Sequence, residues 1–273
     1  MKELTDIALL QIEIDRYSEA KENLDKCFSY FKRNRDRIGQ AATFGLLGTL
    51  FFKEGKYDES IENYKKAYEI YKRLYQYKEE IVCLKSIGNC YIKLRDFDKA
   101  SDYLLEACAV ASDNNDIYSL LDCLEMLIHI YETKKDWDVL LELYKKALDA
   151  FTQIKDQKGT IISCFNLGII KKKFSELEDA LYFFKKGTNV AINSNYSELI
   201  IKGLGYVGEI LFNQGKIKEA IEQYIKALHV ANKIEAKNAI LQIKLLLNSM
   251  GLDNFEIEKK LNEYGKKRNQ NNE

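Results

Sequence analysis

The sequence has no proline among its 273 residues, carries only two histidines, and has a formal net charge of zero. Without proline, no helix loses a backbone donor or meets a ring clash in its interior. Long segments that alternate apolar and polar residues with period two, as expected of strands, are also missing. These absences favour an all-α chain.

The sequence offers little for metal or catalytic chemistry. His129 and His229 lie a hundred residues apart, and the six cysteines contain no Cys-x-x-Cys pair, so we expect no metal site. There is no glycine-rich phosphate loop and no Gly-x-Ser-x-Gly turn. Glu125 and Glu132 flank His129 at one helical turn, but no nucleophile accompanies them. We predict no cofactor and no enzymatic activity.

Charge and hydropathy restrict the classes of partner and the cellular compartment that we expect for this protein. Lys+Arg and Asp+Glu both number 42, which disfavours a surface for nucleic acid. No stretch approaches the roughly 18 apolar residues that a spanning helix needs. Residues Met1 to Arg16 lack the basic start and apolar run of a secretory signal. The cysteines suit reduced core side chains, so the sequence predicts a cytoplasmic protein without membrane contact.

A dipeptide of the form Leu-Gly returns every forty residues. The series is Leu47-Gly48, Ile87-Gly88, Leu127-Ile128, Leu167-Gly168 and Val207-Gly208, with Ile7-Ala8 before it and Leu247-Asn248 after it. A fixed period of this length is typical of a stacked repeat array, in which each unit buries its apolar face against its neighbours.

Each repeat reads as two helices. In the unit from Ala41 to Gln76, apolar residues at helical spacing surround Gly48, and Gly55 then interrupts the pattern. Acidic residues open a second helix, whose inner face is marked by Ser60, Tyr64 and Ala67. We therefore expect Gly48 at a close helix crossing. The pattern predicts six helix pairs over 1–234, a partial seventh pair or capping segment over 235–265, and a disordered polar tail over 266–273.

These stretches resemble the tetratricopeptide repeat, most closely in Ile87-Gly88-Asn89-Cys90-Tyr91 and in Tyr64-Lys65-Lys66-Ala67. The resemblance covers nearly the whole chain and implies a right-handed superhelical solenoid of antiparallel helix pairs. The common period of that family is 34 residues, whereas this chain repeats every 40 and lacks the family proline. It is therefore similar to the long-repeat subgroup of LGN/Pins scaffolds, kinesin light chains and Rap-like peptide sensors.

The fourth pair departs from the pattern. Ile128 replaces the glycine, Leu140 replaces the small residue of the second helix, and Trp137 lies nearby. We expect the helices to sit further apart there, as either a hinge or a drifted but well-packed repeat. Because Met1 falls almost inside the first helix, the sequence is compatible either with an abrupt start or with a longer chain that carries an effector domain.

One face of the first helices is the expected ligand groove. Following the phase of that face along the repeats gives thirteen candidate partner-binding residues: Thr49, Phe52, Lys85, Asn89, Ile92, Lys93, Glu125, His129, Phe165, Ile169, Lys172, Glu209 and Phe212. Exposed aromatic residues in such a groove favour a partner, and the lysines predict a ligand that carries charges of both signs. Lys85 and Asn89 resemble part of a carboxylate clamp whose other members are missing.

The function that follows is a protein–protein interaction scaffold, which holds a peptide segment of a partner in this groove. The alternative is a Rap-like regulatory module that senses a free peptide. The two differ in ligand size, and self-assembly through the array ends is a third reading. The sequence does not indicate an oligomeric state.

Overall fold

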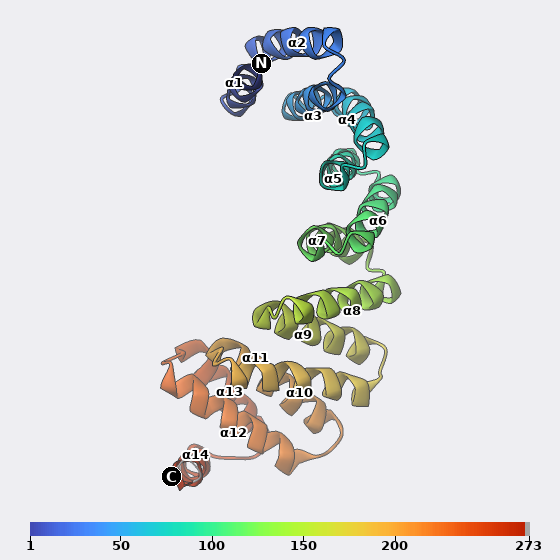
Figure 1. The fold of residues 1–273 in the computed structure, drawn as a ribbon. Coiled ribbons are helices and arrows are strands. Elements are labelled where there is room, and N and C mark those ends of the chain that lie inside the picture. Colours follow the sequence, from blue (N-terminus) through green and yellow to red (C-terminus); the bar gives the residue numbers. More distant parts are fainter. Residues whose placement is uncertain (271–273) are drawn as a thin grey trace. The chain divides into compact units, whose positions relative to one another are not determined.

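The computed structural model describes residues 1–270, and these form helices joined by short turns (Figure 1). The helices are α1 (Lys2–Glu13), α2 (Tyr17–Arg33), α3 (Arg37–Lys53), α4 (Tyr57–Arg73), α5 (Tyr77–Lys93), α6 (Phe97–Asp113), α7 (Ile117–Lys134), α8 (Trp137–Gln153), α9 (Gln157–Lys173), α10 (Leu177–Asn193), α11 (Ser197–Asn213), α12 (Ile217–Lys233), α13 (Lys237–Ser249) and α14 (Asn254–Gln270). No strand occurs within the described residues. The predicted all-α fold, a tetratricopeptide-like solenoid of helix pairs, is confirmed.

The turns between helices repeat one backbone motif. The residue two positions after the helix adopts a left-handed conformation, as at Gly55 with φ 77°; after α7 it is Lys135, the next residue. There the N–H of Gly55 donates to the carbonyl of Phe52 at 3.0 Å, and the N–H of Lys56 donates to that of Phe51 at 2.9 Å. These bonds satisfy carbonyls that the helix end would otherwise leave unpaired. The motif returns every twenty residues and sets the helix spacing.

Several of the following helices begin with an aspartate that caps them. The side chain of Asp36 accepts a hydrogen bond from the backbone N–H of Gly39 at 2.8 Å, which satisfies a donor in the first turn of α3. Four more aspartates cap helices in the same way: Asp96, Asp116, Asp136 and Asp156. A tight left-handed turn followed by a cap makes each helix start well defined.

The chain forms two compact units, Met1–Lys135 and Asp136–Glu273. In unit 1, α2 packs on α1 and α3, α4 on α3 and α5, and α6 on α5 and α7. In unit 2, α8 packs on α9, α10 on α9 and α11, α12 on α11 and α13, and α14 on α12 and α13. The boundary between the units falls inside the fourth pair, which has Ile128 and Leu140 in place of small residues.

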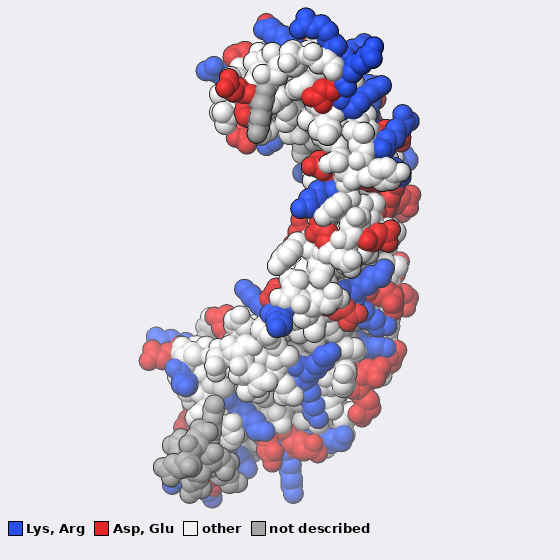
Figure 2. Space-filling model, in the orientation of Figure 1, with Lys and Arg blue, Asp and Glu red and all other residues white. Residues whose placement is uncertain are grey.

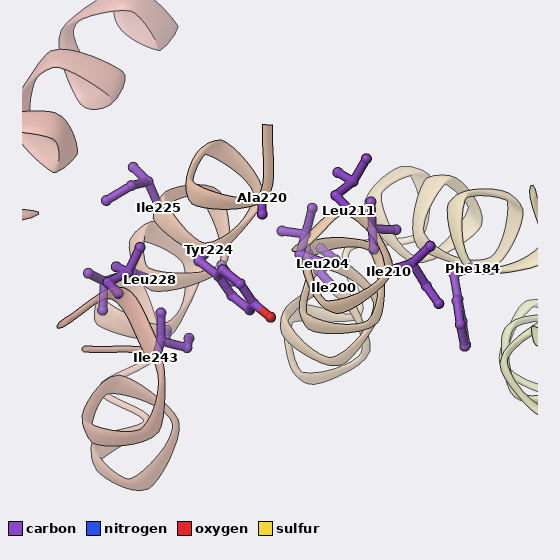
Figure 3. Close-up of a cluster of buried hydrophobic side chains, with 14 of the residues drawn as sticks. Phe184, Ile200, Leu204, Ile210, Leu211, Ala220, Tyr224, Ile225, Leu228 and Ile243 are labelled. Carbon is purple, nitrogen blue, oxygen red and sulfur yellow. The ribbon is translucent and has the colours of Figure 1, made fainter. Parts of the chain in front are cut away.

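Glycines allow the two helices of a pair to approach closely. A Cβ placed on Gly48 would lie 2.8 Å from the ring of Tyr64, and one on Gly168 would lie 2.6 Å from the ring of Phe184. Gly208 has the same relation to Tyr224, whose ring projects from α12 toward α11 in Figure 3. The recurring glycine therefore makes room for the large side chain sixteen residues later.

The C-terminal part differs from the prediction. The last helix was expected to give way to a disordered tail at residue 266, but α14 continues to Gln270, and residues 271–273 lie outside the described part. Because the segment 265–270 contains no proline and only one glycine, nothing in the local sequence forces the helix to end sooner.

Candidate groove on the first helices of unit 1

A groove of about 410 Å³ lies on the first helices of successive pairs in unit 1. It is lined by α1 with Thr5, Asp6 and Leu9; by α3 with Ala42, Gly45, Leu46 and Thr49; by α5 with Lys78, Glu79, Val82, Cys83 and Ser86; and by Tyr64 and Tyr71 of α4. We call this the unit 1 groove.

The floor of the groove is polar but uncharged. The hydroxyls of Tyr64 and Thr49 lie 2.9 Å apart, and Ser86 also hydrogen-bonds Tyr64. Burial raises the pKa of the Tyr71 hydroxyl to about 12 and that of the Cys83 thiol to about 12, so both groups are neutral near pH 7. Neutral hydroxyls of this kind can donate to and accept from a peptide backbone.

The walls of the groove are apolar and have room. Leu9 is 39% exposed and Val82 is 59% exposed, although both are large aliphatic residues. A Cβ placed on Gly45 would meet no atom within 4 Å, so the glycine leaves open space above α3. Asp6, Lys78 and Glu79 supply the charges at the rim. The groove can thus accommodate an apolar side chain of a peptide and form hydrogen bonds with the peptide backbone.

Eight of the thirteen candidate residues lie in unit 1, and only Thr49 lines the groove. Phe52 is half-buried, and its ring packs edge-on against Tyr57 with centroids 5.5 Å apart. Asn89 and Ile92 are half-buried on α5. Lys93 on α5, and Glu125 and His129 on α7, are exposed. The groove-lining residues of α5 end at Ser86, whereas Asn89, Ile92 and Lys93 lie further along that helix.

The expectation that Phe165 is an exposed groove residue is wrong. Its side chain is 3% exposed, and its ring lies against Gly187 of α10 and Gly203 of α11. It also meets the ring of Tyr206 edge-on, with centroids 5.5 Å apart. Phe165 is a core residue because glycines on two neighbouring helices open a pocket for it, which its own helix does not reveal.

The other candidates of unit 2 have mixed environments. Ile169 is half-buried against the same core, whereas Phe212 is 41% exposed on α11. Lys172 and Glu209 bind each other, with Nζ and Oε1 2.5 Å apart. Phe212 is therefore the exposed aromatic residue that remains from this set.

Two lysines expected to face a ligand are already paired. Nζ of Lys85 on α5 lies 2.7 Å from a carboxylate oxygen of Asp122 on α7, much as Lys172 on α9 pairs with Glu209 on α11. Both pairs join first helices of consecutive repeats, with partners 37 residues apart. The sequence pattern predicted that each lysine faces a ligand. In the stacked helices, each lysine instead lies beside a carboxylate of the next repeat.

The sequence pattern missed the tyrosines, Val82 and Ser86. Tyr64 and Tyr71 belong to a second helix, which the pattern assigned to the core. Ser86 follows the expected groove position Lys85 by one residue, and Leu46 lies about one turn before the expected position Thr49. A wider angular window on the first helix would have included them, because neighbouring residues differ by only about 100° around the axis.

Matches to known families agree with this architecture. Residues 4–73 and 39–113 match a family model described as "Tetratricopeptide repeat", and residues 132–202 match one described as "Anaphase-promoting complex subunit 5". Residues 4–113 are thus tetratricopeptide repeats. The repeats of the matched model lie in α1–α6, which include the helices that form the unit 1 groove.

Relatives extend the comparison beyond the family models. The chain is 24% identical over 251 residues to TPR repeat-containing protein MJ1428 of Methanocaldococcus jannaschii, a match that covers 88% of this chain and 40% of that protein. The chain thus spans less than half of that relative. It is similar in fold to apo RapI, with a TM-score of 0.60, 15% identity, and coverage of 94% of this chain and 73% of RapI.

A second solved structure has a similar fold. It is the STAND protein with a tetratricopeptide repeat sensor, PH0952, from Pyrococcus horikoshii, with a TM-score of 0.57 and 16% identity. The match covers 88% of this chain and 38% of that one. Within the described residues, no helix could cross a membrane and no cluster of His, Cys, Asp or Glu could hold a metal ion.

Proposed function

We propose that this chain is a protein-interaction module whose unit 1 groove holds a short peptide segment of a partner protein. Tetratricopeptide arrays use surfaces of this kind for binding, because stacked first helices form a continuous face. The observation that supports the proposal is the open space above Gly45 between the exposed side chains of Leu9 and Val82.

The ligand is expected to be a peptide with an apolar side chain whose neighbouring backbone N–H and C=O groups are available for hydrogen bonds. The apolar group lies between Leu9 and Val82, and the hydroxyls of Thr49 and Ser86 bond the peptide amide beside it. Affinity then depends mainly on the buried apolar group, since exposed charges at the rim contribute only about 0–1 kcal/mol each. Lys78 and Glu79 orient a ligand that carries charges of both signs.

The test replaces Gly45 by tryptophan, which fills the groove from a position where a side chain meets no neighbour. Gly205 is the matched control, because it occupies the same helical phase on α11 and a Cβ there also meets nothing within 4 Å. Affinity capture with the wild type, Gly45→Trp and Gly205→Trp is compared by quantitative mass spectrometry. Ligands of the groove are expected to bind Gly45→Trp at least about tenfold less tightly than the wild type, a loss of about 1.4 kcal/mol in binding free energy. They are expected to bind Gly205→Trp as tightly as the wild type.

The captured material also separates the two functional readings. Segments of folded proteins, confirmed as synthetic peptides by calorimetry, support the scaffold. Free oligopeptides support the peptide sensor. If every captured ligand binds Gly45→Trp as tightly as the wild type, the groove is not the binding site.

A further inference from the structure

Tyr71 of α4 brings an unpaired hydroxyl to the floor of the unit 1 groove. The residue is only 7% exposed and lines the groove. Its hydroxyl forms no hydrogen bond with any residue that the structure describes. The hydroxyl of Tyr64, two turns earlier on α4, instead lies 2.9 Å from that of Thr49. Leaving a buried polar group unpaired costs free energy, so this hydroxyl is available to a ligand.

The other second helices show that packing does not require this hydroxyl. The positions in phase with Tyr71 hold phenylalanine or alanine: Phe31, Ala111, Phe151, Ala191 and Ala231. The ring of Phe31 lies so close to Gly39 that no Cβ would fit on that glycine, and Phe151 has the same relation to Gly159. Forty residues after Gly39 the sequence has Glu79. The Cβ of Glu79 therefore excludes the same ring position for Tyr71, whose ring lines the groove instead.

Carboxylates dominate the charge around Tyr71. Burial, the neighbouring Cys83 and the Glu79 carboxylate raise the pKa of Tyr71 to about 12. Burial, Glu79 and Glu80 raise the pKa of Cys83 to about 12. Although Lys78 also lines the groove, no cation among the described residues lowers either pKa. Acidic and basic side chains are interspersed over the face of unit 1 seen in Figure 2, so these nearby carboxylates decide which ligand charge is favoured here.

A cationic side chain of a ligand would satisfy these groups together. An ammonium or guanidinium group has several donors and no acceptor, so it can donate to both the hydroxyl oxygen of Tyr71 and the carboxylate of Glu79. Its aliphatic stem suits the apolar walls at Leu9 and Val82. A carboxylate would accept a hydrogen bond from Tyr71 but would lie against Glu79, and an apolar group would leave the hydroxyl unpaired.

We propose that the unit 1 groove selects peptides that carry a lysine or arginine side chain, which binds between Tyr71 and Glu79. This inference rests on the proposed function, because it specifies the ligand of the same groove. Tyr64 and Tyr71 lie seven residues apart on α4, so their Cα atoms are about 10 Å apart. An extended peptide covers that distance in about three residues. The basic residue of the ligand therefore lies within about three residues of its apolar residue.

The test screens a synthetic library of N-acetylated octapeptides against the full chain by affinity selection and mass spectrometry. Acetylation removes the terminal ammonium, so any bound cation is a lysine or arginine side chain. Peptides that bind the wild type but not Gly45→Trp are the groove ligands. We expect lysine and arginine to be enriched among them within about three residues of an apolar residue. Groove ligands without this enrichment would overturn the inference alone, whereas a library without any Gly45-dependent ligand would contradict the proposed function as well.

A selected peptide is then compared with a copy in which norleucine replaces the basic residue, because norleucine keeps an aliphatic chain and removes the charge. The wild type is expected to bind the norleucine copy about tenfold less tightly. Tyr71→Phe and Glu79→Gln are each expected to bind the basic peptide about fivefold less tightly than the wild type does. Both variants should bind the norleucine copy as tightly as the wild type. Calorimetry or fluorescence anisotropy measures the affinities.

The controls separate the contact from the fold. Phenylalanine already occupies the position of Tyr71 in two other pairs, so Tyr71→Phe should keep the fold, as thermal melts would verify. Glu198→Gln is the matched control for Glu79→Gln: Glu198 is also acidic and in the first turn of a first helix, but it lies in unit 2. Its replacement should leave both affinities unchanged. If Tyr71→Phe and Glu79→Gln weakened the basic peptide and its norleucine copy equally, neither residue would contact the cation and the proposal would be wrong.

Discussion

At the scale of single residues, the glycines inside the first helices of the pairs have two opposite roles. Gly48 and Gly168 face rings that leave no space for a side chain, whereas Gly45 and Gly205 face open space, although all four lie inside helices. The first two glycines permit close packing. The other two leave the helix surface open and add only backbone freedom to the unfolded chain.

Alanine substitutions should separate these roles. We expect Gly48→Ala and Gly168→Ala to lower the free energy of unfolding by about 1–3 kcal/mol through overpacking. Gly45→Ala and Gly205→Ala should raise it by about 0.5–1 kcal/mol, because alanine restricts the unfolded chain and favours the helix. Urea unfolding of the four variants measures both effects. A loss of stability at Gly45 as large as that at Gly48 would contradict the packing described here.

At the scale of helices, the array depends on left-handed turn residues that are mostly not glycine. Among the described residues, Gly55 and Gly215 have this conformation, and so do ten residues other than glycine, including Tyr75 with φ 54°. The left-handed conformation costs a non-glycine residue roughly 1–2 kcal/mol. The turn persists at those sites because its hydrogen bonds and the packing of both helices compensate for that cost.

A reciprocal pair of substitutions tests this compensation. Tyr75 is 89% exposed, so Tyr75→Gly removes little packing and relieves the backbone; we expect it to raise the free energy of unfolding by about 1 kcal/mol. Gly55→Ala should lower it by about the same amount, since the backbone at Gly55 is left-handed and the helix termini stay unchanged. Thermal or urea unfolding gives both values. If Tyr75→Gly and Gly55→Ala changed the free energy of unfolding by the same amount and in the same direction, the turn conformation would not control stability.

At the scale of the whole molecule, cysteines report on folding in both units. All six are buried, five in unit 1 and Cys164 in unit 2. Burial raises the pKa of Cys83 to about 12 and that of Cys164 to about 11, and it also raises the pKa of Cys27 and Cys90. Thiolate is the reactive form, so both its scarcity and the lack of access protect these residues.

We therefore expect a maleimide reagent near pH 8 to label the native protein very slowly and to label all six thiols once the chain unfolds, when each pKa returns to about 8.5. Mass spectrometry of peptides from a denaturant series assigns each label. Label on Cys164 should appear with the unfolding of unit 2, and label on Cys83 with that of unit 1. Rapid labelling of any of these thiols in the native protein would show local opening around it.

The sequence alone determined the fold class, because the forty-residue recurrence of Leu-Gly and of small and large residues is a local pattern that each repeat restates. It also predicted that one face of the first helices, which includes Thr49, forms a groove. It did not determine which residues of that face stay open. Gly45, Lys85 and Phe165 share one phase, yet the first borders the groove, the second pairs with Asp122, and the third is buried between two other helices. Such differences depend on side chains from neighbouring repeats, about forty residues away, which only the packed array brings into contact.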